Sequence, residues 1–396
     1  MIHVAFVVLR MDTGGAERCI ARLANGLDRD QFRVSIICMV RSGEAALWIK
    51  RDDVDVIELN CPEGNNLTSV RRLAECVRRI KPDIVQSHNW GTLLETHFAV
   101  RSISGISHIH AERGTVLGTN HCGPKQRWLR RIAMRYACRR ARGIVTNADS
   151  IAAKVASIVK TAKSTIHVIP NGVDPAIDEC DLGKEAARCR AMLGIDSDDF
   201  LFTSVGRMVA VKNFSLAIEA FAGLQQSNQK RARLLLVGEG PRRKQWQQLA
   251  NDRGVGDRVI FAGAQKDVWP YLAASDVFIN TSHSEGMSQS LLEAMSVGVP
   301  IIATDVGDAK KIVASPMPCG TIVPPGDCDQ LKQAMADAMT NGQWMSEMSE
   351  AARAKHRDKY GLQSMIRQHE DYYRHNVIGG TKTRMHRTAA VMGATS

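Results

Sequence analysis

The sequence predicts an α/β protein in which two doubly wound, parallel-sheet domains face each other across a cleft. The chain has 396 residues, whereas a domain typically has roughly 150, so it is long enough for two or three hydrophobic cores. Short apolar runs bounded by turn residues alternate with amphipathic stretches, which is typical of parallel strands buried on both faces. This alternation occurs on each side of a turn-rich segment, Pro170–Pro175, and therefore indicates two domains.

The predicted strands fall into two groups. In the first half of the chain they are Ile2–Leu9, Arg33–Val40, Val54–Leu59, Asp83–Ser87, Ser107–Ala111, Gly143–Thr146 and Ile166–Ile169. In the second half they are Phe200–Val205, Arg233–Val237, Val259–Phe261, Val277–Asn280, Pro300–Ala303 and Gly320–Val323. Because open parallel sheets bind ligands beyond the carboxyl ends of their strands, chemistry is expected in the loops that follow these strands.

These elements also predict the domain boundaries. The first domain covers residues 1–175, a polar and charge-rich connection covers 176–198, and the second domain covers 199–361. We expect a helix over 362–376 that packs back toward the first domain. The last segment, 377–396, carries three cations and no acid, and we expect it to be disordered.

The composition excludes several classes of protein. The hydrophobic fraction is 44% and the charged fraction 23%, as in soluble globular chains. The ten cysteines form no C-x-x-C pair and no zinc-type cluster, so we expect scattered thiols in a reducing compartment. No apolar run reaches the roughly 18 residues that span a bilayer, and the apolar start lacks a basic leader. These features predict a cytoplasmic protein.

The charge balance points to an anionic partner. Lys and Arg number 52 and Asp and Glu 41, which gives a formal net charge of +11. This excess alone does not choose among nucleic acid, nucleotide, phosphate and anionic membrane. An aromatic fraction of 5% without a recognition motif argues against nucleic acid.

Two glycines follow the first strand. Gly14 and Gly15 precede a helix predicted over Cys19–Leu27, where backbone N–H groups and the helix N-terminus could approach an anion. The dinucleotide fingerprint G-x-G-x-x-G is absent. From the residues alone, an anion site and a tight turn that merely requires glycine are equally supported.

Two cations stand at the end of a strand in the second half. Arg207 closes the strand Phe200–Val205, and Lys212 precedes a helix predicted over Phe214–Leu224. A planar guanidinium and an ammonium beside a helix N-terminus would suit a diphosphate, although solvated surface charges would show the same spacing. A later strand ends in a glycine turn at Gly238.

Two carboxylates follow the strand Val277–Asn280. Glu285 lies in the loop, and Glu293 lies about two turns into a helix predicted to begin near Ser288. Because helical side chains tilt toward the N-terminus, Glu293 would point back toward the loop. Two carboxylates and free backbone N–H groups would suit a polyhydroxylated, phosphorylated ligand. The alternative is an ordinary capped helix with one solvated Glu.

In their shared order, these pieces resemble the family 4 retaining glycosyltransferases, which have two Rossmann-like domains in the GT-B arrangement. The resemblance covers roughly Met1–Tyr373. The matching segments are Gly14–Arg18, Asn171–Asp174, Val205–Arg207 with Lys212–Asn213, Gly238–Pro241, Ser284–Met295, Gly298–Pro300 and Ala303–Gly307.

The resemblance implies roles for individual positions. Arg207 and Lys212 would hold the donor diphosphate, Glu285 would contact hydroxyls of the transferred sugar, and Glu293 would bind the donor ribose. The other implied donor contacts are Gly286, Met287, Ser290, Leu291, Gly14, Gly15 and Gly238. Such enzymes typically need no metal or other cofactor, since cations and helix dipoles stabilise the leaving diphosphate. In agreement, no D-x-D pair follows a strand at a cleft loop, and Asp305–Asp308 is expected to form a turn.

One segment departs from the family pattern. Family members carry Glu-His-Gly where this chain has Glu112–Gly114, so Arg113 stands where the family histidine lies near the sugar. His110 comes three residues earlier, and on a strand its side chain would face the opposite side from Arg113. His88 and Asn89, at the end of another strand, are equally suited to an acceptor pocket and to a capped helix start.

A basic segment, residues 122–143, holds eight cations and no acid. Its apolar residues recur at helical spacing on another face and are Trp128, Leu129, Ile132, Tyr136 and Ala137. A basic amphipathic helix is typical of a peripheral contact with an anionic membrane. A helix whose apolar stripe packs on the core, with solvated arginines, is equally supported.

The resulting functional prediction is a metal-independent, retaining glycosyltransferase. It would move a hexose-type sugar from a nucleotide-diphosphate-sugar to a hydroxyl of a lipid-linked or cell-surface polysaccharide or lipopolysaccharide precursor, at the inner face of the membrane. Two alternatives stay open: a sugar-nucleotide epimerase on the same architecture, and a non-catalytic sugar-nucleotide-binding protein. The spacing of Arg207, Lys212, Glu285 and Glu293 favours the transferase.

Overall fold

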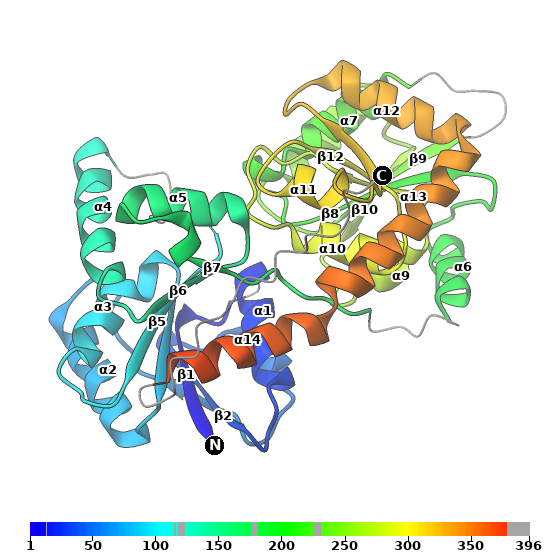
Figure 1. The fold of residues 1–396 in the computed structure, drawn as a ribbon. Coiled ribbons are helices and arrows are strands. Elements are labelled where there is room, and N and C mark those ends of the chain that lie inside the picture. Colours follow the sequence, from blue (N-terminus) through cyan, green and yellow to red (C-terminus); the bar gives the residue numbers. More distant parts are fainter. Residues whose placement is uncertain (13, 115, 118–122, 176–180, 225–230, 378–396) are drawn as a thin grey trace, which may run out of the picture.

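The computed structural model contains two parallel α/β sheets, each covered by helices on both faces (Figure 1). It describes the whole chain except residues 13, 115, 118–122, 176–180, 225–230 and 378–396. The segment predicted to be disordered, 377–396, therefore lies outside the described residues from position 378 onward. In the described ranges no helix is long and apolar enough to cross a bilayer.

The first sheet has seven strands in the order β3-β2-β1-β4-β5-β6-β7. Their bounds are Ile2–Arg10 (β1), Phe32–Arg41 (β2), Asp55–Glu58 (β3), Ile84–His88 (β4), Ser107–Glu112 (β5), Gly143–Thr146 (β6) and His167–Val168 (β7). The strand order reverses direction next to β1, which pairs with both β2 and β4. In doubly wound sheets this switch point is where ligands bind.

The second sheet has six strands in the order β10-β9-β8-β11-β12-β13. Their bounds are Phe200–Val205 (β8), Ala232–Val237 (β9), Val259–Gly263 (β10), Val277–Asn280 (β11), Ile301–Thr304 (β12) and Gly320–Val323 (β13). The switch point lies between β8 and β11. The predicted fold class of two doubly wound parallel sheets is confirmed, and each predicted strand is present with its ends within two residues.

The helices fill the connections between these strands. Around the first sheet they are Gly15–Gly26 (α1), Leu67–Ile80 (α2), Trp90–Val100 (α3), Pro124–Cys138 (α4) and Asp149–Val159 (α5). Around the second they are Leu182–Met192 (α6), Phe214–Ala222 (α7), Arg243–Asp252 (α8), Trp269–Ala273 (α9), Gln289–Ser296 (α10), Ala309–Val313 (α11), Cys328–Thr340 (α12) and Gly342–Lys355 (α13). Short helical turns are Glu44–Trp48 (η1), Lys163–Thr165 (η2), Ala210–Lys212 (η3) and His356–Tyr360 (η4).

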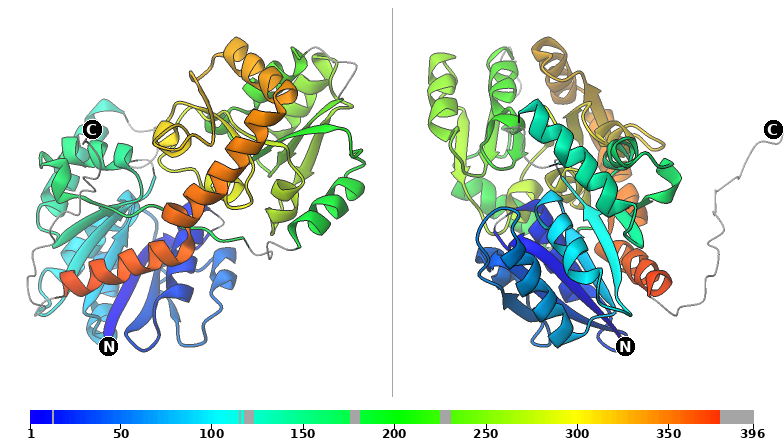
Figure 2. Two further views of the ribbon diagram at one scale, coloured as in Figure 1. Left: turned by 45° about the vertical axis from the view of Figure 1, so that its right-hand side comes forward. Right: turned by 90° about the vertical axis from the view of Figure 1, so that its left-hand side faces the viewer.

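The last helix returns to the first sheet. After α13 the chain turns at η4, and α14 (Leu362–Asn376) lies against β1 and α1 (Figures 1 and 2). Tyr373 is fully buried there and its hydroxyl donates a hydrogen bond to Gln86 Oε1 at 3.0 Å. Its ring packs near those of Phe6 and Phe32. Aromatic burial of this kind stabilises the return crossing by a few kcal/mol.

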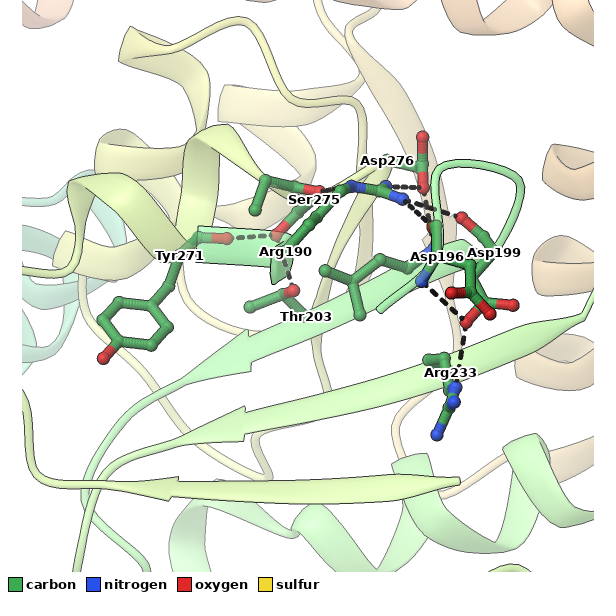
Figure 3. Close-up of polar contacts among 10 residues, drawn as sticks. Arg190, Asp196, Asp199, Thr203, Arg233, Tyr271, Ser275 and Asp276 are labelled. Carbon is green, nitrogen blue, oxygen red and sulfur yellow. Dashed lines mark hydrogen bonds and ion pairs between the residues drawn. The ribbon is translucent and has the colours of Figure 1, made fainter. Parts of the chain in front are cut away.

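Arg190 of helix α6 binds the second sheet at the amino ends of its strands. Its guanidinium donates to Asp276 Oδ2 at 2.7 Å and to the carbonyl oxygens of Ala274, Asp196 and Asp199 (Figure 3). The same Asp276 oxygen accepts the backbone N–H of Leu201 at the start of β8. This network lies at the amino ends of the strands, so it has a structural rather than a chemical role.

Candidate active site

Polar residues gather where the carboxyl ends of the second sheet's strands face the first domain. They come from the loops after β8, β9, β11 and β12 and from the start of α10. Opposite them lie the start of α1 and the start of α5. This is the position that open parallel sheets reserve for ligands.

Lys212 and Glu285 form an ion pair across two of these loops. Lys212 Nζ lies 2.5 Å from Glu285 Oε1, and the Ser282 hydroxyl donates to the same oxygen at 2.7 Å. The two charged side chains are 21% and 17% exposed, so the pair is partly shielded from water while still reachable. The structure thus brings together two residues predicted from sequence. Ser282 was missed, because a serine in a loop carries no signal of its own.

Arg207 lies in the loop after β8, two residues beyond the last strand residue, Val205. Its side chain is exposed and forms no hydrogen bond or ion pair within the described ranges. Burial raises the pKa of Glu17 on α1, and the charge of Arg207 opposes this rise. Arg207 is therefore close enough to α1 to act electrostatically across the gap between the domains.

Gly238 holds the loop after β9 against the loop after β8. Its φ angle is +140°, and a Cβ atom there would lie 2.0 Å from the carbonyl oxygen of Gly206. Such a contact is impossible for any side chain, so glycine is required. The sequence prediction of a donor contact for Gly238 is untested, and the geometry supports a backbone role.

Glu293 is buried and joins the two domains. Its Oε1 accepts hydrogen bonds from Arg18 Nη1 and Arg22 Nη2, both at 3.2 Å. Arg22 Nη1 also donates to Gln289 Oε1 at 2.7 Å. Arg18 and Arg22 lie four residues apart on one face of α1, so their spacing placed them side by side. The sequence did not reveal that this face meets α10.

The N-terminal end of α10 forms part of the site. Ser288 is the N-cap residue, and its hydroxyl contacts Asn280 Nδ2 and the Ser290 hydroxyl. The helix begins at Gln289, next to the predicted position. Leu291 packs its side chain into the core. Ser290 and Leu291 can therefore serve a ligand mainly through the helix N-terminus.

Gly286 and Met287 press against the first domain. A Cβ atom on Gly286 would lie 3.1 Å from Ile151 Cγ1 on α5. Met287 is buried, and its sulfur accepts the backbone N–H of Asn171 at 3.2 Å. The segment after Glu285 thus contacts both α5 and the end of the first domain.

Helix α1 begins at Gly15, four residues earlier than the sequence predicted. Gly14 is its extended N-cap, and the side chain of Glu17 occupies the space where a Cβ on Gly14 would lie. A Cβ on Gly15 would lie 3.5 Å from Gln289 Cγ. Ala16 and Glu17 are good helix formers, so the helix can start at the glycines. Gly15 therefore faces the second domain, whereas Gly14 packs against Glu17 of the same helix.

Asp308 ties the domains together at another point. Its carboxylate accepts the backbone N–H groups of Asp149 at 2.7 Å and Ser150 at 2.8 Å, at the start of α5. Helix α5 has no N-cap side chain of its own, so a residue of the second domain supplies the cap. Residues 307–308 do form the expected turn, but the capping role was not predicted.

The residues predicted on the acceptor side separate into two groups. Asn89 Oδ1 accepts the Arg113 backbone N–H at 3.0 Å. Arg113 reaches Cys19 Sγ, Asn171 Oδ1 and His369 Nε2 at 3.1, 3.2 and 2.9 Å. It thus touches α1, the end of the first domain and α14 together.

His110 and His88 lie elsewhere. His110 is fully buried on β5, where Nδ1 contacts Ser87 Oγ at 3.0 Å and Nε2 lies 3.7 Å from Glu112 Oε2. Burial, together with the nearby charge of Arg113, lowers the pKa of His88 to about 3. Neither imidazole opens toward the second domain in the contacts it makes, so their acceptor roles stay predictions.

In the part of the chain that the structure describes, no three His, Cys, Asp or Glu side chains gather as a possible metal site. Lys212 is the cation paired with Glu285, and Arg207 lies in the same loop after β8. The arrangement offers positive charge, two carboxylates and a helix N-terminus around one space. It can bind an anionic group and hydroxyls at once.

Comparison with known proteins agrees with this geometry. Residues 13–177 match the family described as Glycosyltransferase Family 4, and residues 187–355 match Glycosyl transferases group 1. A lipopolysaccharide core biosynthesis glycosyltransferase, LpsE of Rhizobium meliloti, is 29% identical over 74% of this chain and 76% of its own length. A UDP-Gal:α-D-GlcNAc-diphosphoundecaprenol α-1,3-galactosyltransferase of Escherichia coli is 26% identical over 94% and 96%.

Solved structures share the fold. A glycosyltransferase from Rickettsia africae superposes with a TM-score of 0.80 at 18% identity, covering 96% of this chain and 99% of that one. Anabaena Alr3699/HepE in complex with UDP-glucose gives a TM-score of 0.78 at 20% identity, covering 94% and 99%. At these identities the likeness concerns the fold alone.

Proposed function

Since the chain belongs to the group 1 and family 4 glycosyltransferases, which are retaining enzymes with the GT-B fold, we propose a specific reaction for it. It transfers a hexose-type sugar from a UDP-sugar to a hydroxyl of a lipid-linked saccharide. The product is a precursor of lipopolysaccharide or of a surface polysaccharide. The names of two sequence relatives, a core glycosyltransferase and a galactosyltransferase acting on a diphosphoundecaprenol-linked sugar, support this acceptor class.

One observation carries the proposal. The Lys212–Glu285 ion pair and the Glu293 carboxylate lie at the carboxyl ends of the second sheet and face α1 of the first domain. This places cations, hydroxyl acceptors and a helix N-terminus around one space between two domains. A sugar nucleotide has a diphosphate and a row of hydroxyls, so it matches this set.

The chemistry follows from these groups. As the bond between the anomeric carbon and the diphosphate oxygen breaks, negative charge grows on the diphosphate. Lys212 and Arg207 stabilise this charge in a site that is partly shielded from water. The acceptor oxygen bonds to the same face of the anomeric carbon, and its proton passes to the departing β-phosphate. Glu285 orients sugar hydroxyls and Glu293 the ribose, and no protein nucleophile takes part.

Helix α4 supports a membrane-bound acceptor. Trp128, Leu129, Ile132 and Tyr136 are 60%, 51%, 43% and 38% exposed, so the predicted apolar stripe, apart from Ala137, does not pack on the core. The core-facing residues of α4 are instead Met134, Ala137 and Cys138. Of the two interpretations of this basic helix, the exposed apolar face favours peripheral contact with an anionic membrane.

The test is a transfer assay with a panel of nucleotide sugars and a polyprenyl-diphosphate-linked saccharide. We expect release of UDP together with a product that keeps the anomeric configuration of the donor. An incubation with the donor alone is the control. An isomerised sugar nucleotide in that control, or an inverted product, would contradict the proposal.

A further inference from the structure

A cavity of about 770 Å³ opens on the first domain at the edge of the sheet away from the candidate active site. Ser107, the first residue of β5, lies in its wall, whereas the active site lies beyond the carboxyl ends of the strands. Four segments meet there: the end of α3, the start of β5, the residues after α4, and the end of α14. The lining residues are His97, Val100, Arg101, Ile103, Ile106, Ser107, His108, Arg140, Arg142, His375 and Asn376.

The cavity wall is strongly cationic. It contains three arginines and three histidines and no carboxylate. Within the described ranges, none of Arg101, Arg140 and Arg142 forms an ion pair, and their hydrogen bonds go to backbone carbonyl groups. Burial lowers the pKa of His97, and the charges of Arg101 and Arg140 lower it further. Positive charge is therefore concentrated here without an internal partner.

His108, one of the lining residues, carries a buried ring nitrogen without a hydrogen-bond partner. His108 is 6% exposed, and its Nε2 contacts Ser87 Oγ at 3.0 Å. Its Nδ1 is buried and has no hydrogen-bond partner in the structure. Buried polar atoms are normally satisfied, so this unpartnered nitrogen is an unusual feature of the residues that surround the cavity.

Apolar and aromatic side chains line the cavity and the surface between it and helix α4. Val100, Ile103 and Ile106 line it. Exposed Phe98 and Tyr136 lie beside it, with ring centroids 6.3 Å apart, and the Arg140 guanidinium lies 3.9 Å from the Tyr136 ring. The same surface continues along α4 to Trp128 and its neighbours. A molecule with an anionic head and an apolar part would match both regions.

We propose that this cavity is a second ligand site, which binds a phosphate group through Arg101, Arg140 and Arg142. Guanidinium groups bind phosphate oxygens through paired, charge-assisted hydrogen bonds. The site is separate from the donor diphosphate site, because it lies at the opposite end of the first sheet. The phosphate can belong to the headgroup of an anionic lipid or to a free phosphorylated molecule.

The first arm of the test uses inorganic phosphate with the full-length protein. Histidine ring resonances of ¹⁵N-labelled protein are followed by NMR during a titration at constant ionic strength, with His97 assigned by a His97→Gln variant. We expect a saturable shift of the His97 resonances. The double variant R101Q/R140Q should weaken this binding at least tenfold, since charge-assisted hydrogen bonds are lost.

The matched control is the double variant R127Q/R131Q, which removes two exposed arginines of α4 that do not line the cavity. It should leave phosphate binding unchanged. Equal weakening in both variants would show general charge loss and would overturn the site. Equal phosphate binding by the wild type and by R101Q/R140Q would also overturn the site. Circular dichroism of each variant checks that the fold is retained.

The second arm distinguishes the two sources of phosphate. Vesicles of phosphatidylglycerol in phosphatidylcholine replace inorganic phosphate, and binding is measured by flotation. A headgroup ligand predicts that R101Q/R140Q binds these vesicles at least tenfold more weakly than R127Q/R131Q. Equal vesicle binding by the two variants, together with loss of inorganic phosphate binding in R101Q/R140Q alone, assigns the site to a free phosphorylated ligand. If R101Q/R140Q keeps both its phosphate binding and its vesicle binding, the proposal fails.

Discussion

At the scale of single residues, Lys212 and Glu285 show how two loops become one site. Lys212 ends η3 after β8, and Glu285 follows β11, so the pair forms only because β8 and β11 are neighbours in the sheet. Ser282 fixes the same carboxylate oxygen and limits its movement. The ammonium is thereby held in place before a ligand arrives, which reduces the reorganisation needed during reaction.

Replacing Lys212 by Ala should lower kcat/KM at least tenfold. Loss of a charged contact to the diphosphate costs about 1.5–3 kcal/mol of transition-state stabilisation. Initial rates with a UDP-sugar and a lipid-linked acceptor measure this effect. Lys332→Ala is the control, because Lys332 pairs with Asp329 on the surface of α12, far from the site. Wild-type kcat/KM in the Lys212 variant would remove Lys212 from the proposed machinery.

Arg22 and Asp308 make long-range contacts that the sequence pattern did not predict. Arg22 meets Gln289 and Glu293 across more than 260 positions of sequence, and Asp308 caps a helix 159 positions earlier. Neither residue lies in a motif that carries a signal for these contacts. That Glu285 and Glu293 share one ligand site stays a prediction from the sequence. His110 and Arg113 make separate sets of contacts.

At the scale of elements, α5 depends on the second domain for its N-terminal cap. Asp308→Ala should therefore free the first N–H groups of α5 and lower stability by about 1–2 kcal/mol. It should also loosen the contact between the domains. Small-angle scattering should show a larger radius of gyration, and hydrogen exchange should speed up at Asp149 and Ser150.

Asp327→Ala is the matched control for this prediction. Asp327 caps α12 within the second domain, where its Oδ1 accepts the Gln330 N–H at 3.0 Å. Its loss should lower the melting temperature without changing the radius of gyration. If the two variants behave alike in scattering, the Asp308 contact does not hold the domains together.

Helix α4 has an exposed apolar face whose role can be tested separately. The double variant W128S/L129S should bind phosphatidylglycerol vesicles several-fold more weakly in a flotation assay, since about two large apolar side chains no longer enter the interface. L47S/L67S removes two exposed leucines outside α4 and should bind as the wild type does. Absence of wild-type binding to anionic as well as neutral vesicles would end the membrane hypothesis.

At the scale of the whole molecule, buried histidines make stability depend on pH. Burial lowers the pKa of both His88 and His108 to about 3, and it also lowers that of His369. In the unfolded chain these groups titrate near pH 6.5. Below that pH the unfolded state takes up protons that the folded state does not bind, so stability falls as the pH falls.

Equilibrium unfolding in urea at several pH values tests this linkage. Between about pH 7 and pH 5.5, His88 and His108 together should lower the free energy of unfolding by roughly 2 kcal/mol. The fall should continue toward pH 3, where the folded protein begins to bind the same protons. A flat curve between pH 7 and pH 5.5 would show that these imidazoles are not held neutral by the fold.

The sequence by itself determined the two parallel sheets and the order of the motifs. A short apolar run between amphipathic stretches indicates a segment that is buried on both faces. The observed strands coincide closely with these runs. The position of each motif after a strand then placed Lys212, Glu285 and Glu293 at one edge of a sheet. The start of α1 was less well predicted, because two glycines carry no helix signal.

Only the tertiary structure decided which of these groups meet. Packing of segments far apart in the chain brought α1 onto α10, Asp308 onto α5, and four separate segments around the cationic cavity. The orientation of α4 was also decided there, since the sequence supported two orientations of its apolar stripe. Of that stripe only Ala137 is buried, together with Met134 and Cys138. Local sequence patterns predict which segments are buried. Which residues meet across a domain interface depends instead on how the folded surfaces of the two domains pack together.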